Sequence, residues 1–281
     1  MIEFEHFVKQ YKDFRLELSM NIPDSKVVGI IGRNGCGKST TIKAILGLVK
    51  PTSGSIRVFG KESRELTARD KEKIGAALSD STFPFLLSVE DIIAILRAMY
   101  REFDEAFFRE MCGKLDLPLK KPLKDFSTGM KAKVKVLAAI SHKASLLILD
   151  EPTAGLDVEA RNEIISFLKE YVRAHDCTIL ISSHISTDLE GLCDEFYLFS
   201  DGKVILHETG DNIGNRYGTV QIPFELFETV DRNRISGYKK EMFGYACITN
   251  DKAYFEAHYP ELKVKSASID DFILLLGGDE A

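Results

Sequence analysis

The feature that most constrains this chain is a glycine-rich octapeptide between a short apolar run and a helical pattern. Residues 32–39 read Gly-Arg-Asn-Gly-Cys-Gly-Lys-Ser and fit the spacing G-x-x-x-x-G-K-[ST] in full. The apolar run Val27–Ile31 before them is typical of a buried parallel strand, and the residues after them have helical spacing. Glycines let such a loop turn its backbone N–H groups inward, toward an anion at the start of the helix. The motif therefore predicts a phosphate-binding loop.

The octapeptide also contains the side chains that nucleotide chemistry requires. Lys38 supplies a mobile positive charge for the β- and γ-phosphates, and the Ser39 hydroxyl is a ligand for Mg²⁺. The cofactors predicted from the motif are ATP and Mg²⁺. The predicted nucleotide-binding residues are Gly32, Arg33, Asn34, Gly35, Cys36, Gly37, Lys38, Ser39 and Thr40.

Two adjacent carboxylates follow a second buried-strand pattern. Residues 146–149 are Leu-Leu-Ile-Leu, and Asp150 and Glu151 come directly after them. Open α/β sheets place ligand groups at the carboxyl ends of their strands. We expect Asp150 to hold Mg²⁺, directly or through water, and Glu151 to orient or deprotonate the water that attacks the γ-phosphate. By itself, such a pair is also compatible with the capping of a helix.

Composition excludes several classes of protein. The net charge of −6 argues against a chain-wide electrostatic contact with nucleic acid, so no nucleic-acid partner is expected. No apolar stretch approaches the roughly 20 residues that span a bilayer, and the start MIEFEHFVKQYKDF has no signal-peptide pattern. Five scattered cysteines without a CxxC spacing indicate reduced thiols in a cytoplasm.

The remaining patterns predict where helices interrupt the strands. Residues 80–140 read as a helical insertion, in which Ser88 and Asp91 resemble a capping box and residues 104–115 form a second helix. A third buried strand is expected over residues 178–183, directly before His184. Further helices are expected over residues 39–48, 161–172 and 268–276, and a hairpin turn over residues 201–203.

A family resemblance becomes visible at residues 126–130, which read Phe-Ser-Thr-Gly-Met. This pentapeptide resembles the LSGGQ signature of ATP-binding cassette (ABC) ATPases, and its serine lies 23 residues before Asp150. With the phosphate-binding loop, the Asp150–Glu151 pair, Ala-Gly-Leu-Asp at residues 154–157 and His184, the order resembles an ABC transporter nucleotide-binding subunit over residues 1–210. Residues 268–272 weakly resemble the closing helix of cassettes that serve bacterial ABC-2-type exporters.

The resemblance implies a role for each matching residue. Two cassettes pack head to tail in this family, so Ser127, Thr128 and Gly129 would face the γ-phosphate bound by the loop of a second cassette. Asp157 would couple the two sites, and His184 would contact the γ-phosphate and act in catalysis with Glu151 and Lys38. Tyr11 occupies the position of the aromatic residue that stacks on adenine, with Phe14 as a neighbouring alternative.

One departure from the family pattern and one apolar cluster beside it have alternative readings. Where the family carries a glutamine, this chain has Ser79 and Asp80, and either oxygen could reach Mg²⁺ or the attacking water. The cluster Phe-Pro-Phe-Leu-Leu at residues 83–87 follows, in the region that receives a permease helix in the family. Burial inside the helical insertion is the alternative reading of that cluster.

The expected fold is α/β: a P-loop (RecA-like) ABC ATPase core with a small antiparallel β subdomain, an inserted helical subdomain and a small C-terminal α/β tail. We expect the ATPase domain over residues 1–210, its helical subdomain over about 80–140, and an accessory region over 211–281. The expected function is ATP hydrolysis for a membrane exporter with a separate permease chain, at the cytoplasmic face of the membrane, in a homo- or heterodimer of cassettes. The alternatives are a soluble ABC ATPase for cofactor assembly and a non-catalytic nucleotide-binding module.

Overall fold

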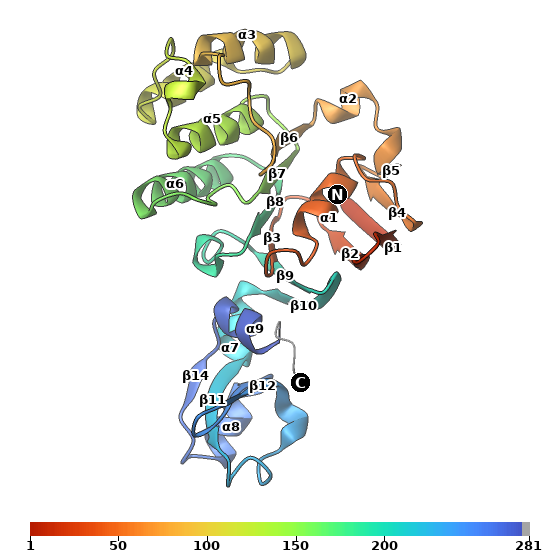
Figure 1. Ribbon diagram of the computed structural model, residues 1–281, viewed down its shortest axis with the longest axis vertical. Coiled ribbons are helices and arrows are strands. Elements are labelled where there is room, and N and C mark those ends of the chain that lie inside the picture. The colour runs from red at the N-terminus through yellow and green to blue at the C-terminus, as the bar shows by residue number, and fades with distance from the viewer. Residues whose placement is uncertain (277–281) are drawn as a thin grey trace.

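Two β-sheets organise the chain, and the computed structural model describes residues 1–276 (Figure 1). The larger sheet has ten strands in the order β5-β4-β1-β2-β10-β9-β3-β8-β7-β6, and the smaller has four in the order β12-β13-β11-β14. The strands of the large sheet are β1 (Ile2–Gln10), β2 (Arg15–Ile22), β3 (Val27–Ile31), β4 (Ser53–Val58), β5 (Lys61–Glu62), β6 (Ile74–Ala77), β7 (Leu146–Asp150), β8 (Thr178–Ser183), β9 (Glu195–Ser200) and β10 (Lys203–Thr209).

The centre of the large sheet is parallel. Strands β9, β3, β8, β7 and β6 are neighbours and run in one direction, with β3 between β8 and β9. Every residue of β3 and β7 is buried, because helices and loops cover both faces of this part of the sheet. Parallel pairing brings the carboxyl ends of β3, β7 and β8 to the same edge, which is where the sequence motifs begin.

The other half of the large sheet is antiparallel. Strands β2, β1, β4 and β5 form it, and a single residue pair, Lys203–Glu17, joins β10 to β2. The predicted hairpin between β9 and β10 turns at Asp201 and Gly202, whose φ angles are 45° and 75°. The predicted fold class, with a parallel core and a small antiparallel subdomain, is confirmed.

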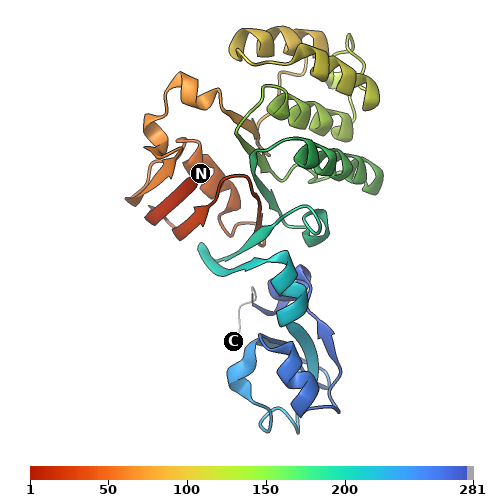
Figure 2. The same cartoon turned by 180° about the vertical axis from the view of Figure 1, so that it is seen from behind.

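Helices lie beside the parallel strands, as Figures 1 and 2 show from opposite sides, with α3 to α6 stacked on the side away from β1, β2 and β4. Helix α1 ends at Ile45, earlier than predicted, because Gly47 takes a φ of 71°. Helix α6 starts earlier than predicted, because Asp157 caps it. The helices of this part are α1 (Lys38–Ile45), α2 (Ala68–Lys71), α3 (Val89–Met99), α4 (Glu105–Lys114), α5 (Thr128–Ile140) and α6 (Val158–Ala174).

The predicted helix caps have the expected geometry. Ser88 and Asp91 form a complete capping box at the start of α3, in which each side chain accepts from the other residue's N–H. Ser268 and Asp271 repeat the arrangement at the start of α9. Within residues 1–276, no helix is long and apolar enough to cross a membrane.

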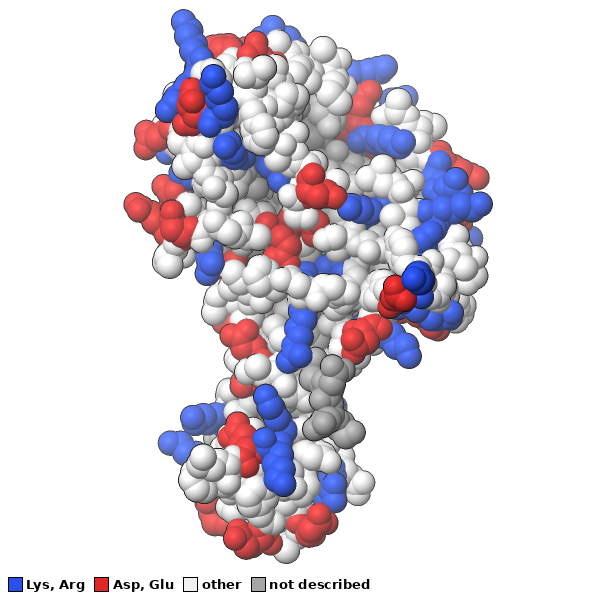
Figure 3. Space-filling view, viewed as in Figure 1, with Lys and Arg blue, Asp and Glu red and all other residues white. Residues whose placement is uncertain are grey.

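The chain after Thr209 forms a second, smaller lobe below a narrower waist (Figure 3). Its strands are β11 (Gly218–Pro223), β12 (Ile235–Glu241), β13 (Gly244–Thr249) and β14 (Val264–Ser266), and its helices are α7 (Gly210–Arg216), α8 (Lys252–His258) and α9 (Ile269–Leu275). Helix α9 returns to the first lobe, because Ile269 and Phe272 share a hydrophobic cluster with Leu189 and Phe196. The last five residues of the predicted accessory region lie outside the described residues.

Candidate nucleotide-binding site

The glycine-rich loop joins the end of β3 to the start of α1. Gly37 caps the helix with a φ of 115°, and a Cβ there would lie 2.7 Å from the Leu16 side chain, so glycine is required. Gly37 offers no side-chain acceptor for the first amides of α1, and the first turn holds no acidic residue. The unpaired amides and the positive end of the helix dipole therefore suit an anion such as a nucleotide phosphate.

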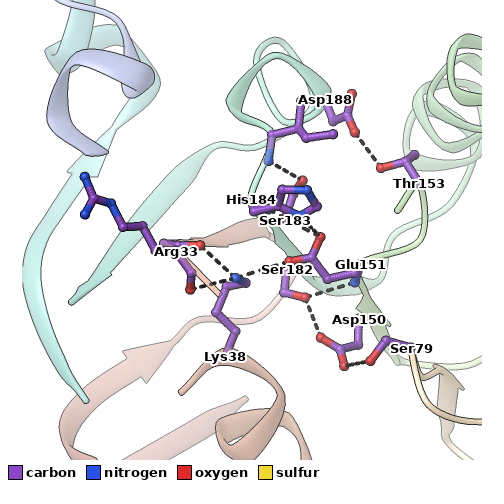
Figure 4. A network of polar contacts seen from close by, with 12 residues as sticks. Arg33, Lys38, Ser79, Asp150, Glu151, Thr153, Ser182, Ser183, His184 and Asp188 are labelled. Carbon is purple, nitrogen blue, oxygen red and sulfur yellow. Dashed lines mark hydrogen bonds and ion pairs between the residues drawn. The ribbon is translucent and has the colours of Figure 1, made fainter. Parts of the chain in front are cut away.

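Lys38 is the buried cation at the centre of this loop. Its side chain is 5 % exposed, and its Nζ donates to the carbonyl oxygen of Gly32 over 2.7 Å. The same Nζ lies 3.2 Å from Oε1 of Glu151. The loop carbonyl and one carboxylate thus hold the ammonium group where a phosphate would meet it. Arg33 lies in the same loop, but its side chain points away from the carboxylates (Figure 4).

Asp150 is the buried acceptor for three hydroxyl groups. Its carboxylate receives Ser182 Oγ over 2.6 Å, Ser79 Oγ over 2.7 Å and Ser39 Oγ over 3.3 Å. These hydroxyl and carboxylate oxygens are the ligand types that Mg²⁺ prefers. Within residues 1–276, no group of three or more His, Cys, Asp or Glu could hold a metal. The hydroxyl and carboxylate oxygens around Asp150 fit a cation that takes further oxygens from phosphate and water, as Mg²⁺ does.

Glu151 stands between Lys38 and His184 (Figure 4). Its Oε2 lies 2.6 Å from His184 Nδ1, and its backbone N–H donates to Ser182 Oγ over 3.0 Å. Its backbone has a φ of 49°, a conformation that non-glycine residues rarely adopt and that occurs often at functional sites. The carboxylate is 11 % exposed, whereas the His184 ring is 38 % exposed.

The structure separates the two residues that replace the family's glutamine. Ser79 reaches Asp150, as given above, whereas Asp80 forms an exposed salt bridge of 2.6 Å with Lys43 of α1. The hydrogen bond from Lys43 holds the pKa of Asp80 below its usual range. Of the two residues, Ser79 is thus the one beside the candidate Mg²⁺ ligand.

The signature residues are not part of this polar network. Ser127 caps α5 and accepts from the Met130 N–H over 3.1 Å, and Asp157 caps α6 and accepts from the Ala160 N–H over 2.8 Å. Ser127, Thr128 and Asp157 are exposed. The two helices start close together, since a Cβ on Gly129 would lie 2.9 Å from the Cβ of Ala160. The signature therefore presents a helix start at the surface.

The two candidate aromatic residues lie near the loop in different settings. Tyr11 is 41 % exposed, and its ring centroid lies 6.4 Å from that of Phe14. Phe14 lines a cavity of about 260 Å³ together with loop residues 32–36, Asp201 and Ile273 of α9. Tyr11 thus exposes its ring at the surface, where Lys9 Nζ lies 5.2 Å from the ring centroid, and Phe14 packs against the loop.

Sequence reasoning missed several residues of the network. Ser182 contacts both Asp150 and Glu151, and the only sequence signal was a pair of serines at the end of a buried strand. Thr153 donates to the buried carboxylate of Asp188, in the segment just after His184. That contact ties the loop after Glu151 to the loop after His184.

Comparisons with known proteins agree with this geometry. The family model described as "ABC transporter" matches residues 16–154. A lantibiotic transport ATP-binding protein, SrtF of Streptococcus pyogenes, is 36 % identical over 76 % of this chain and 93 % of its own length. A bacitracin transport ATP-binding protein, BcrA of Enterococcus faecalis, is 34 % identical over 73 % of this chain and 68 % of its own. A solved structure titled as an ATP-binding subunit of an ABC transporter shares 28 % identity, with a TM-score of 0.66 over 76 % of this chain and 91 % of that one.

Proposed function

This chain belongs to the ABC transporter family of ATP-binding subunits, and on that basis we propose that it powers a membrane exporter whose permease is a separate chain. The observation that carries the proposal is the convergence of Lys38, Asp150, Glu151 and His184 beside one phosphate-binding loop. The relatives are named as lantibiotic and bacitracin transport proteins, which makes peptide antibiotics the first cargo class to test. These names favour transport over assembly of a cofactor.

The chain is an ATPase, and the residues of the site have separable tasks in our proposal. The amides of the loop and Lys38 bind the phosphates, and Tyr11 stacks on the base. Ser39 and Asp150, with Ser79 beside them, would hold Mg²⁺, which neutralises the charge that develops on the phosphate oxygens. Glu151 takes the proton of the attacking water, and His184, whose Nδ1 lies 2.6 Å from Glu151 without nucleotide, would contact the γ-phosphate.

A second cassette completes each site. Ser127, Thr128 and Gly129 start a helix at the surface and make no polar contact with Lys38 or Glu151 within the described part of the chain. A helix start that faces solvent suits the γ-phosphate held by another protomer. The arrangement supports a C₂ dimer with two shared sites, in which Asp157 lies near the signature and couples them. The partner can be a second copy of this chain or a different cassette.

The permease is proposed to dock on the helical insertion. A cavity of about 180 Å³ lies there, and its lining includes Ala77, Phe83, Ile95 and Met99. Phe85 and Leu86, which follow the lining residue Phe83 in the chain, are 55 % and 77 % exposed, which is unusual for such large apolar side chains. Such a surface suits an apolar helix of a membrane protein and supports a peripheral position at the cytoplasmic face. For Phe85 and Leu86 the exposure favours docking over burial within the insertion, whereas Phe83 and Leu87 pack against the core.

We retain the division into an ATPase domain (1–210) and an accessory region (211–281) as part of the proposal. The large sheet ends at Thr209 and the second sheet starts at Gly218, which supports a boundary between them. Because α9 packs against the first lobe, the accessory region would move with that lobe.

One purification tests the proposal. Tagged Glu151→Gln protein is isolated with Mg-ATP from detergent-solubilised cells of its native host. A stoichiometric polytopic membrane protein in the complex is the expected result, and a second, different cassette would identify a heterodimer. Recovery of soluble partners alone, with none of the tagged chain in the membrane fraction, would contradict the exporter function.

A further inference from the structure

A lysine inside the helical insertion reaches toward the nucleotide site. Lys135 of α5 is partly buried, and its Nζ donates to the backbone carbonyl oxygen of Leu78 over 2.5 Å. The same side chain lines the cavity of about 180 Å³ that also contains Ala76 and Ala138. Its ammonium group thus lies between that cavity and the loop that follows β6.

The loop that Lys135 contacts is tied to three different elements through three consecutive residues. The carbonyl of Leu78 is bound by Lys135 of α5, the hydroxyl of Ser79 is bound to Asp150 at the end of β7, and Asp80 is paired with Lys43 of α1. Ser79 has a short side chain, so its 2.7 Å contact with Asp150 depends on where the backbone of the loop lies. The Lys135 contact acts on the backbone one residue earlier.

We propose that Lys135 is a positioning residue of the ATPase site, an inference that rests on the proposed function. Lys135 holds the Leu78 carbonyl and thereby keeps Ser79 Oγ against Asp150. It never touches the nucleotide. Its effect passes through Ser79 to the carboxylate that would bind Mg²⁺.

The place of Lys135 in the fold carries a free-energy cost that its hydrogen bond offsets. Burial among alanines and aliphatic side chains lowers the pKa of Lys135, although Asp150 and Asp80 oppose that shift. An ammonium group that leaves water costs free energy unless it is hydrogen-bonded, and the partner of Lys135 is the Leu78 carbonyl. A structural contact and a positioning contact differ in one consequence, since only the second requires the geometry of Ser79 and Asp150 to change when Lys135 is replaced.

The test compares Lys135→Met, Lys135→Gln and Ser79→Ala in the full chain. The first readout is the ratio of the dissociation constants of a fluorescent ATP derivative in EDTA and in Mg²⁺, which isolates the contribution of the cation to binding. We expect Lys135→Met to reduce that ratio about three- to tenfold, the size of one hydrogen bond, and Lys135→Gln, which keeps an N–H donor, to reduce it less. Lys114→Met, at an exposed lysine of α4, is the matched control and should leave the ratio unchanged.

The double variant Lys135→Met/Ser79→Ala separates positioning from packing. Both residues act through one contact. We therefore expect the double variant to lower the ratio of dissociation constants no further than the single variant with the larger loss, whereas independent effects would add. Additive losses, or an unchanged ratio in Lys135→Met, would overturn the inference.

A second readout does not depend on nucleotide. Hydrogen exchange of residues 79–82 in the nucleotide-free protein should become faster in Lys135→Met, while thermal unfolding shows that the fold is kept. Unchanged exchange would overturn the inference whatever the activity of the protein. Absence of Mg-ATP binding by the unsubstituted chain would instead contradict the proposed function, so the two failures are distinguishable.

Discussion

The Nδ1 atom of His184 lies 2.6 Å from Oε2 of Glu151, and the other oxygen of that carboxylate lies 3.2 Å from Lys38 Nζ. One carboxylate therefore holds two donors that suit a terminal phosphate. We expect a bound phosphate to compete with Glu151 for both, so that nucleotide entry changes the position of the carboxylate.

The first prediction concerns the proton acceptor. Glu151→Gln keeps the size of the side chain and one acceptor oxygen but removes the base, so turnover should fall about 10²- to 10⁴-fold while ATP affinity is retained. Phosphate release and equilibrium nucleotide binding measure the two quantities separately. Glu159→Gln, at an exposed residue of α6, is the control and should retain turnover. Unchanged turnover in Glu151→Gln would rule out its assignment as the base.

The second prediction concerns the exposed apolar side chains of the helical insertion. Phe85→Asp places a charge on a side chain that is 55 % exposed, so the protein should fold and bind ATP. Affinity for the membrane partner should fall about 30-fold or more, as for a central interface aromatic. Co-purification with the permease measures this. Met242→Asp, 81 % exposed in the second lobe, should have no effect, and loss of folding in Phe85→Asp would support burial of the cluster instead.

The third prediction compares two glycines. A Cβ on Gly202 would lie 1.9 Å from the carbonyl oxygen of Arg15, at a φ of 75°, so Gly202→Ala should lower the free energy of unfolding by about 1–3 kcal/mol. Gly113 in α4 has no such neighbour within 4 Å, so Gly113→Ala should raise it by about 0.5–1 kcal/mol. Urea unfolding midpoints give both values. Equal effects of the two substitutions would contradict the proposed backbone strain at the β9–β10 turn.

The fourth prediction concerns the thiol in the phosphate-binding loop. Burial raises the pKa of Cys36, so near neutral pH its thiol is protonated and unreactive. Because the thiolate is the reactive form, iodoacetamide should label Cys36 more slowly in the folded protein than in the unfolded chain. The labelling rate should increase at a higher pH than for an ordinary thiol. Bound Mg-ATP should slow it further. Mass spectrometry of the Cys36 peptide at pH 7 to 9.5 provides the measurement, and fast labelling at pH 7 would contradict it.

The elements that carry the site follow from local sequence. The loop at residues 32–39 and the Asp150–Glu151 pair are each contiguous, and each follows an apolar run that is buried along its whole length in the sheet. Capping at Ser88 and Ser268 is equally local, since each box spans four residues. Such features depend on local backbone conformation and on the spacing of apolar residues, and both are determined by residues that are close together in the sequence.

The partners within the site depend on the tertiary structure. Parallel pairing of β7 with β8 sets Asp150 opposite Ser182, a register that the sequence of neither strand specifies alone. Packing of α5 against β6 brings Lys135 to Leu78, and it leaves Ser79 rather than Asp80 beside Asp150. The sequence by itself determined which chemical groups are available and which strand ends and helix starts carry them. Tertiary structure decided which of those groups meet, because contacts between residues 32 to 71 positions apart depend on strand order and side-chain packing.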